Sequence, residues 1–337
     1  MFLLLKLPLL CIREILKKIN PRDLIHFSLA SKNSYRLLKL MRTRVNVLTL
    51  NQREGKIMFD DFNEEEWCIN VGDFKEKATI TTNMNGAEVR TYMTDTNSYS
   101  YTDQNVFEFL KYAIQYLTEI FNCYVDHCWF DIDRMENMNK IFEFGITRCY
   151  HLRLDGERLV GDEEMLSIIK AFTVQKYSFY LNLSDTFYCD PDLIKTRYLY
   201  CSKTCGKWVT GETFLRLQRI PTIWFCTPKQ NSLTADDFIA FISQWYHSDN
   251  TQFKTLTIRA EWEIPDGSLT QFNPRQYNPK KRGPAFRFSN TKAISSVGGT
   301  DILRSDDILA TVIYRPKYNF FHVWHERFPN VSDVRVI

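Results

Sequence analysis

Cysteine and histidine are the residue types here that could carry covalent or metal chemistry, and the chain holds nine cysteines and six histidines. Cys201 and Cys205, with Cys189 and Cys226 nearby, have a spacing that zinc can use. A structural zinc site also needs a second close cysteine pair or a histidine pair, and neither is present. We therefore interpret these cysteines as buried thiols and expect no metal.

A cysteine nucleophile is the second chemistry that these residues permit. His127 precedes Cys128, but neighbouring residues of a strand point to opposite faces, and no nucleophile motif surrounds any cysteine. His325-Glu326 lacks the second histidine of a zinc-peptidase helix, and Gly298-Gly299-Thr300 lacks the lysine and helix of a phosphate loop. We expect no catalytic residue and no cofactor; a thiol hydrolase is the enzymatic alternative.

A basic loop over residues 275–287 is a local candidate for binding. The candidate target-binding residues are Arg275, Tyr277, Lys280, Lys281 and Arg282. The net charge of +3 gives the whole chain no strong field for nucleic acid or an anionic membrane. A solvated loop is the simplest interpretation, contact with an acidic protein target comes next, and nucleic acid comes last.

The composition is that of an ordered globular chain, with 44% hydrophobic and 25% charged residues over 337 positions. An odd number of dispersed cysteines indicates reduced thiols, so we expect the protein in the cytoplasm, the nucleus or both. No apolar run is long enough for a transmembrane helix. The apolar start resembles a signal peptide, but Lys6 and Pro8 interrupt it and charged residues follow where a cleavage site should be.

Three short helices are predicted before residue 44. Leu9, Ile12 and Leu16 have helical spacing after Pro8. Asn20 is placed to cap a second helix that begins at Pro21, and Ser31 is placed to cap a third. Three such helices are too few to be stable alone, so part of their apolar surface should need a partner.

The remaining chain predicts a mixed α/β fold. From Val45 the hydrophobic period is two, and Asn85-Gly86 is a hairpin signal, so we expect an antiparallel meander over 55–100 and then a helix over 105–121. Strands and helices then alternate. The expected strands are 128–132, 150–154, 177–183, 198–200, 222–225 and 256–258, and the expected helices are 135–144, 162–172, 211–219 and 234–246.

Strand starts spaced 20 to 33 residues apart favour an irregular leucine-rich-repeat-like solenoid, with a doubly wound α/β sheet as the alternative. After Pro265 the chain should be rich in loops, with further strands at 285–288, 307–314 and 319–324. We expect three segments: a helical module over 1–44, a strand-rich antiparallel segment over 45–104 and a repeat-like α/β region over 105–337.

The N-terminal segment closely resembles the F-box. The matching elements are Leu7-Pro8, Glu14-Ile15-Leu16, Asp23-Leu24 and Ser31-Lys32, in that order. The resemblance implies that the helices dock on a small Skp-type adaptor and, through it, on a cullin. Spaced aliphatic side chains can fill grooves between partner helices. The expected adaptor-binding residues are Leu7, Pro8, Ile12, Ile15, Leu16, Leu24 and Leu29.

Residues from about 195 to 325 resemble, more loosely, the type 2 F-box-associated domain of a large nematode family. The likeness lies in Phe238–Tyr246, Phe253–Ile258, Asn278–Gly283 with Phe286–Phe288, and Asp301–Thr311. Together the two resemblances imply a non-catalytic substrate receptor of a ubiquitin ligase, whose C-terminal body binds an unknown protein target. An F-box scaffold without ligase function is the alternative.

Overall fold

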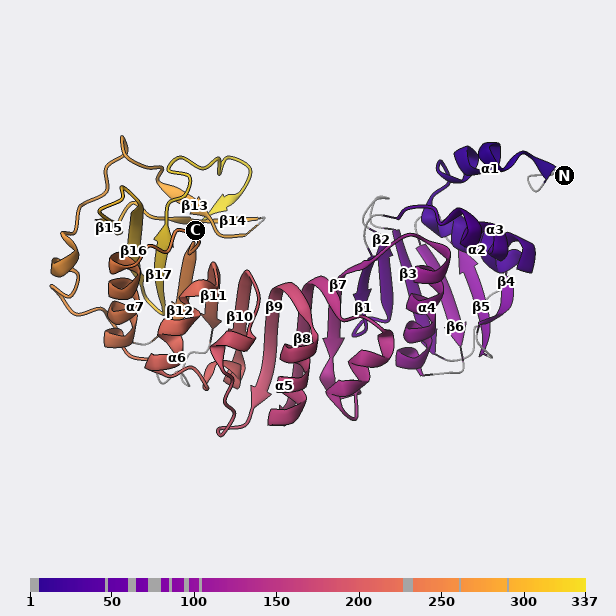
Figure 1. Cartoon of the computed structure of the whole chain (residues 1–337), viewed down its shortest axis with the longest axis horizontal. Coiled ribbons are helices and arrows are strands. Elements are labelled where there is room, and N and C mark those ends of the chain that lie inside the picture. Colours follow the sequence, from indigo (N-terminus) through magenta and orange to yellow (C-terminus); the bar gives the residue numbers. More distant parts are fainter. Residues whose placement is uncertain are drawn as a thin grey trace. The chain divides into compact units, whose positions relative to one another are not determined.

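The computed structural model describes residues 6–45, 48–59, 65–71, 80–84, 87–93, 97–102, 105–226, 233–260, 262–289 and 291–337 (Figure 1). The chain forms two compact units, the first of Met1–Gly156 with Ala171–Val174 and the second of Glu157–Lys170 with Gln175–Ile337. Both units are mixed α/β, as the sequence predicts. The division into three segments stays a prediction.

The three N-terminal helices form as predicted, and their caps explain their limits. They are α1 (Leu9–Leu16), α2 (Pro21–Ala30) and α3 (Lys32–Met41). The side chain of Asn20 accepts a hydrogen bond from the backbone N–H of Asp23 at 2.7 Å, and Ser31 Oγ accepts one from Ser34 N–H at 3.0 Å. Each cap satisfies a backbone donor that the first helical turn leaves free. Helix α3 ends where Arg42 adopts a left-handed conformation, with φ of +42°.

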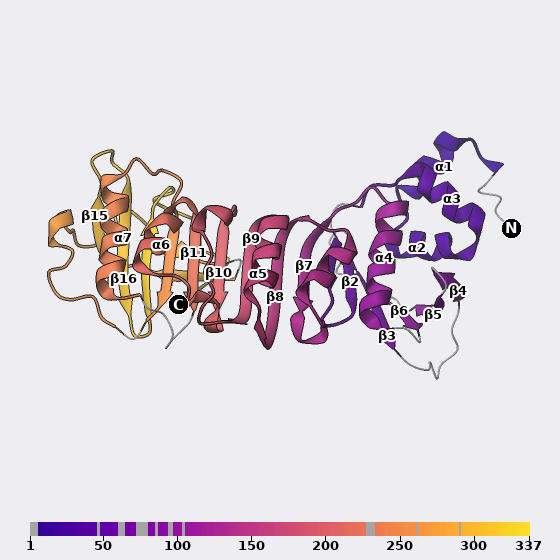
Figure 2. The ribbon, with the colours of Figure 1, turned by 60° about the horizontal axis from the view of Figure 1, so that its bottom comes forward.

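Helix α4 (Val106–Ile120) connects these helices to the rest of the first unit (Figure 2). On one side, the ring of Phe109 meets the edge of Trp67 from the sheet, with centroids 6.4 Å apart. On the other side, Tyr116 stacks on Tyr35 of α3 and shares a 2.5 Å hydrogen bond with the hydroxyl of Ser28 in α2. The helical module therefore packs against one face of α4.

The sheet of the first unit is more complex than a meander. Its strands are β1 (Leu48–Asn51), β2 (Lys56–Phe59), β3 (Glu65–Val71), β4 (Ile80–Met84), β5 (Ala87–Met93), β6 (Asn97–Thr102), β7 (Val125–Asp131) and the part of β8 (Arg148–Val160) up to Gly156. Neighbours β1-β2-β3 and β4-β5-β6 are antiparallel, but β3 pairs with β6 in parallel. The predicted continuous meander is therefore wrong. Asn85-Gly86, the hairpin signal, lies outside the described residues, and the strands before and after it, β4 and β5, are antiparallel.

In the second unit, consecutive strands lie side by side and run parallel. These strands are β9 (Thr173–Leu183), β10 (Tyr198–Ser202), β11 (Thr222–Cys226) and β12 (Thr255–Arg259). Antiparallel strands β17 (Tyr318–Val323), β16 (Leu309–Arg315) and β15 (Thr300–Leu303) continue from β12. All six strands predicted from residue 128 to 258 are confirmed, with slightly different limits, as are those at 307–314 and 319–324.

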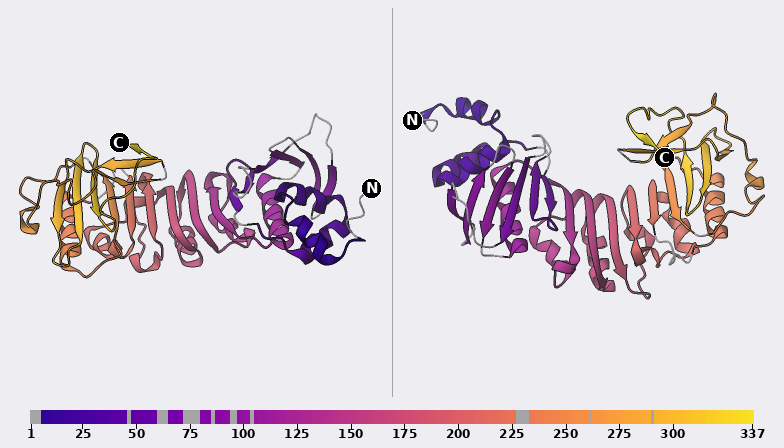
Figure 3. Two further views of the ribbon diagram at one scale, coloured as in Figure 1. Left: turned by 90° about the horizontal axis from the view of Figure 1, so that it is seen from above. Right: turned by 180° about the vertical axis from the view of Figure 1, so that it is seen from behind.

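The sheet of the second unit is covered on both faces near its antiparallel end (Figure 3). Helix α7 (Ala235–His247) covers one face, where Trp245 meets Phe321 of β17 at a ring distance of 5.1 Å. A small sheet of β13 (Ala285–Arg287), β14 (Lys292–Ser295) and β18 (Arg335–Val336) covers the other face. There Phe286 stacks on His322, at 3.9 Å. Phe321 and His322 thus face opposite sides, as the strand period of two requires.

The helices between the strands follow the predictions with one exception. Helices α5 (Asp162–Ala171), α6 (Gly211–Arg216) and α7 form, and Thr234 caps α7. The segment predicted as a helix over 135–144 is a 3₁₀-helix over Met138–Phe144. Its buried residues Met138, Ile141 and Phe144 repeat every three positions, which matches three residues per turn and not 3.6. In the described part of the chain, no helix is long and apolar enough to span a membrane.

Candidate functional site

Helix α1 exposes apolar side chains that the described residues of its unit leave uncovered. Leu9 is 55% exposed and Leu10 is 75% exposed, and Pro8 and Cys11 beside them are also exposed. Ile12, by contrast, is 3% exposed and faces the core. The helix therefore has an inner apolar face that folds the module and an outer apolar patch of Pro8, Leu9, Leu10 and Cys11. Such a patch is typical of a protein-binding surface.

The seven residues predicted to meet an adaptor divide by burial. Pro8 is exposed, and Leu7, Ile15 and Leu29 are half-buried. Ile12, Leu16 and Leu24 are buried within the first unit, so they can support a contact but cannot touch a partner in this conformation. Leu9, Leu10 and the 68% exposed Leu40 of α3 were not among the predicted residues. Leu10 could have been identified from the sequence as an apolar residue that lies outside the helical spacing of Ile12 and Leu16.

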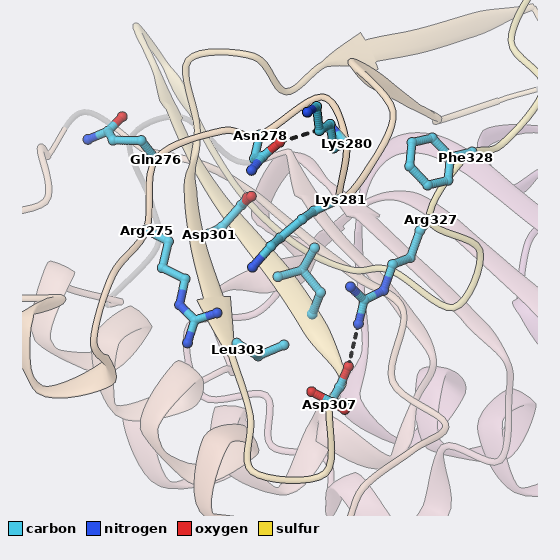
Figure 4. A pocket seen from close by; sticks show the side chains of 11 residues that line it. Arg275, Gln276, Asn278, Lys280, Lys281, Asp301, Leu303, Asp307, Arg327 and Phe328 are labelled. Carbon is cyan, nitrogen blue, oxygen red and sulfur yellow. Dashed lines mark hydrogen bonds between the residues drawn. The ribbon is translucent and has the colours of Figure 1, made fainter.

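The predicted basic loop borders a cavity of about 430 Å³ in the second unit (Figure 4). Loop residues, strand residues of β15 and β16, and the segment after β17 line it. The lining residues are Arg275, Gln276, Asn278, Lys280, Lys281, Asp301, Leu303, Asp307, Leu309, Arg327 and Phe328. Of the five predicted target-binding residues, Arg275, Lys280 and Lys281 are exposed at this cavity.

The prediction for Arg282 is wrong, because this side chain is completely buried. Its Nε donates to both carboxylate oxygens of Asp301, at 2.8 and 2.9 Å, and its terminal nitrogens donate to Ser296 Oγ and the carbonyl of Ser296. The guanidinium lies 4.6 Å from the ring of half-buried Tyr277 and 5.0 Å from that of Trp324. Arg282 is therefore an internal anchor of the loop and cannot bind a target.

Backbone hydrogen bonds complete the anchoring of this loop. Arg275 and Asp301 exchange two backbone hydrogen bonds of 2.8 Å, which join the start of the loop to β15. Asn278 Oδ1 accepts from the backbone N–H of Lys280 at 2.9 Å, and Gly283 N–H donates to the carbonyl of Arg327 at 2.6 Å. The exposed lysines thus project from a backbone fixed at both ends.

The eight cysteines whose side chains the structure describes are all free, and five of them are buried. Burial, with a hydrogen bond to Cys205, raises the pKa of the Cys201 thiol well above its usual range. Burial also raises the pKa of Cys123 and of Cys189 to about 12. These shifts oppose the thiolate that a nucleophile or zinc ligand needs. Within the described residues, no group of three His, Cys, Asp or Glu side chains lies together as a metal would require.

Comparison with known proteins gives one positive result. A family model for the F-box domain matches residues 4–46, the segment that contains α1, α2 and α3. No curated protein and no solved structure matches the chain. The chain therefore carries an F-box domain at its N-terminal end.

Proposed function

We propose that this protein is a substrate-receptor subunit of a Skp/cullin/F-box ubiquitin ligase. The F-box domain would dock on a Skp-type adaptor, and the second unit would bind the protein to be ubiquitylated. The observation that carries the proposal is the exposed apolar patch on α1, which lies inside the matched F-box domain. We propose no covalent chemistry for this chain, because an adaptor acts by holding two proteins near each other.

The proposed adaptor contact combines an exposed layer with a buried one. Pro8, Leu9 and Leu10 would insert into grooves of the adaptor, since exposed aliphatic side chains on a short helix fit between partner helices. Half-buried Leu7, Ile15 and Leu29 would form the edge of the contact. Ile12, Leu16 and Leu24 would hold α1 and α2 in place beneath it.

We further propose that the body is a leucine-rich-repeat-like array of the type 2 F-box-associated kind. In its support, strands β9 to β12 follow chain order without reversal, and they begin at Thr173, Tyr198, Thr222 and Thr255. A doubly wound sheet would reverse its strand order at some point. Free cysteines also fit our proposal of a cytoplasmic or nuclear location.

Co-purification followed by mass spectrometry tests the proposed function. Wild type and Leu7→Ala/Pro8→Ala would be expressed with proteasome inhibition, which preserves ubiquitylated targets. We expect the wild type to recover a Skp-type adaptor and a cullin, and the variant to lose both. Recovery of the adaptor without a cullin would favour the scaffold function, and adaptor binding by the variant would contradict the proposed contact.

A further inference from the structure

The cavity in the second unit holds more positive charge than its own residues neutralise. Arg275, Lys280, Lys281 and Arg327 line it, together with the carboxylates of Asp301 and Asp307. Asp301 is neutralised inside the fold by Arg282 and also accepts a 2.7 Å hydrogen bond from Thr311 Oγ1. Only the exposed Asp307 is left to balance four cations, so an entering anion would meet excess positive charge.

Three of these cations have no acidic partner among the described residues. Arg275, Lys280 and Lys281 form no ion pair with any carboxylate in the part of the chain that the structure describes. Arg327 donates through Nη2 to the backbone carbonyl of Asp307, at 2.6 Å, which holds its guanidinium at the wall. Figure 4 shows Lys281 extending into the middle of the cavity, between Arg275 and Arg327.

The cavity is also prepared for binding, because its loop is fixed by interactions that do not use the charged groups of Arg275, Lys280 and Lys281. The buried ion pair of Arg282 and Asp301 anchors the loop. The side chain of Asn278 accepts a hydrogen bond from Lys280 N–H and so fixes the turn that carries both lysines. A ligand would therefore order only the ends of long side chains and not the backbone. Binding sites that need little ordering lose less affinity to entropy.

An apolar wall adjoins the charged one. Phe328 is 57% exposed at the cavity, and Leu303 and Leu309 lie in the same lining. A small inorganic anion would make no use of these side chains. A peptide segment with an apolar residue beside its anionic residues would contact both walls.

We infer that this cavity binds an anionic segment of the target protein, in which carboxylate or phosphorylated side chains stand beside an apolar residue. The inference rests on the proposed function, since it assigns a chemistry to the target. A volume of about 430 Å³ suits a few side chains of a peptide. Single-stranded nucleic acid is less well matched, because it binds to grooves with several aromatic platforms and this lining has one aromatic residue, Phe328.

Fluorescence anisotropy with the purified full chain tests the inference. Four probes of equal length would be used: a labelled peptide with three glutamates followed by leucine, the same peptide with phosphoserines, one with lysines, and a single-stranded oligonucleotide. We expect one or both anionic peptides to bind, with affinity that falls as salt increases, and the lysine peptide not to bind. The better of the two anionic peptides identifies the source of the negative charge.

Charge reversal at the cavity provides the matched variants. Lys281→Glu and Arg275→Glu should each weaken binding by about tenfold or more, because each change removes an attraction and adds a repulsion. Lys292→Glu, at an exposed position of β14 outside the cavity, should leave the affinity unchanged. Thermal unfolding of each variant would confirm that it is folded like the wild type.

The outcomes separate this inference from the proposed function, because adaptor binding is measured on the same samples. If neither anionic peptide binds while the adaptor does, the inference is wrong and the ligase function stands. If the peptides bind and the adaptor does not, the ligase function is wrong and the anion site stands. Tighter binding of the oligonucleotide than of either peptide, or equal weakening by Lys292→Glu, would also overturn the inference.

Discussion

In the N-terminal helices the exposed patch on α1 is apolar, and short-range caps at Asn20 and Ser31 set where the next two helices begin. In the loop around Lys281 the exposed charged side chains are cations, and a buried ion pair between residues 19 positions apart fixes the backbone. The first surface is suited to a permanent apolar contact, while the second is suited to selecting a charged ligand. A partner-binding surface can therefore be supported either by helix caps between residues close in sequence or by one ion pair between residues far apart in sequence.

The largest effect should come from removing the long-range interaction. Asp301→Asn leaves the buried guanidinium of Arg282 without its counter-charge, so the free energy of unfolding of the second unit should fall by about 3–5 kcal/mol. Urea unfolding, followed by amide hydrogen exchange in β15 and β16, would measure it. Asp333→Asn is the control, because Asp333 pairs with Arg287 at the surface, and it should behave like wild type. A similar small change in both variants would show that the Arg282 anchor is dispensable.

The second largest effect should be a loss of stability of the second unit in acid, caused by His322. Burial, together with the nearby charges of His325 and Arg282, lowers the pKa of His322 to about 3. Since the unfolded chain has a histidine pKa of about 6.5, it binds the proton more readily than the folded chain. Stability is therefore fully present above pH 6.5 and is lost as the pH falls towards 3.

When the pH falls from 7 to 5, protonation of this histidine in the unfolded chain should lower the free energy of unfolding by about 1–2 kcal/mol. Urea unfolding at both pH values would measure the loss. His322→Gln should remove most of it, whereas His247→Gln, at an exposed position, should not. Burial also lowers the pKa of His26 in α2, so a smaller acid effect of the same sign is expected in the first unit. If the unfolding free energy of His322→Gln fell as much between pH 7 and pH 5 as that of the wild type, His322 would not be the source of the acid effect.

Removing the Asn20 cap from the N-terminal helices should have a smaller effect on stability. Asn20→Ala deletes the acceptor of the Asp23 N–H and should destabilise α2 by about 1 kcal/mol. Faster hydrogen exchange of the first amides of α2 would report it. Asn33→Ala, at an exposed position within α3, should change exchange much less. Equal effects of the two substitutions would mean that the cap does not set where α2 begins.

The same contrast explains which features the sequence could predict. Caps at Asn20, Ser31 and Thr234 are signals within four residues, and the helices that follow them form as expected. The parallel pairing of β6 with β3 and the small sheet strands β14 and β18 were missed. Their pairing depends on distant segments, and nothing in the local hydrophobic pattern records it.

Burial of charged and apolar residues was the other part that sequence could not predict. Arg282 looks like its neighbours Lys280 and Lys281, and only the position of Asp301 on β15 makes it an internal residue. Leu9 and Ile12 are both apolar on one short helix, yet the first is exposed and the second is buried. Which side a helix presents depends on what packs against it.

The most direct test of the proposed function is the affinity of the purified full chain for a Skp-type adaptor, measured by calorimetry for wild type and Leu9→Asp/Leu10→Asp. Both residues lie in the first turn of α1, which has no acidic residue, so aspartates there favour the helix dipole and should not harm folding. They would remove the exposed apolar patch. Leu159→Asp, which changes a 64% exposed leucine of β8, is the control.

We predict that the wild type and Leu159→Asp bind the adaptor equally, and that the double variant binds more than about 30-fold more weakly while unfolding like the wild type. Equal affinity of all three proteins, or no measurable affinity in the wild type, would contradict the proposed role of the F-box domain.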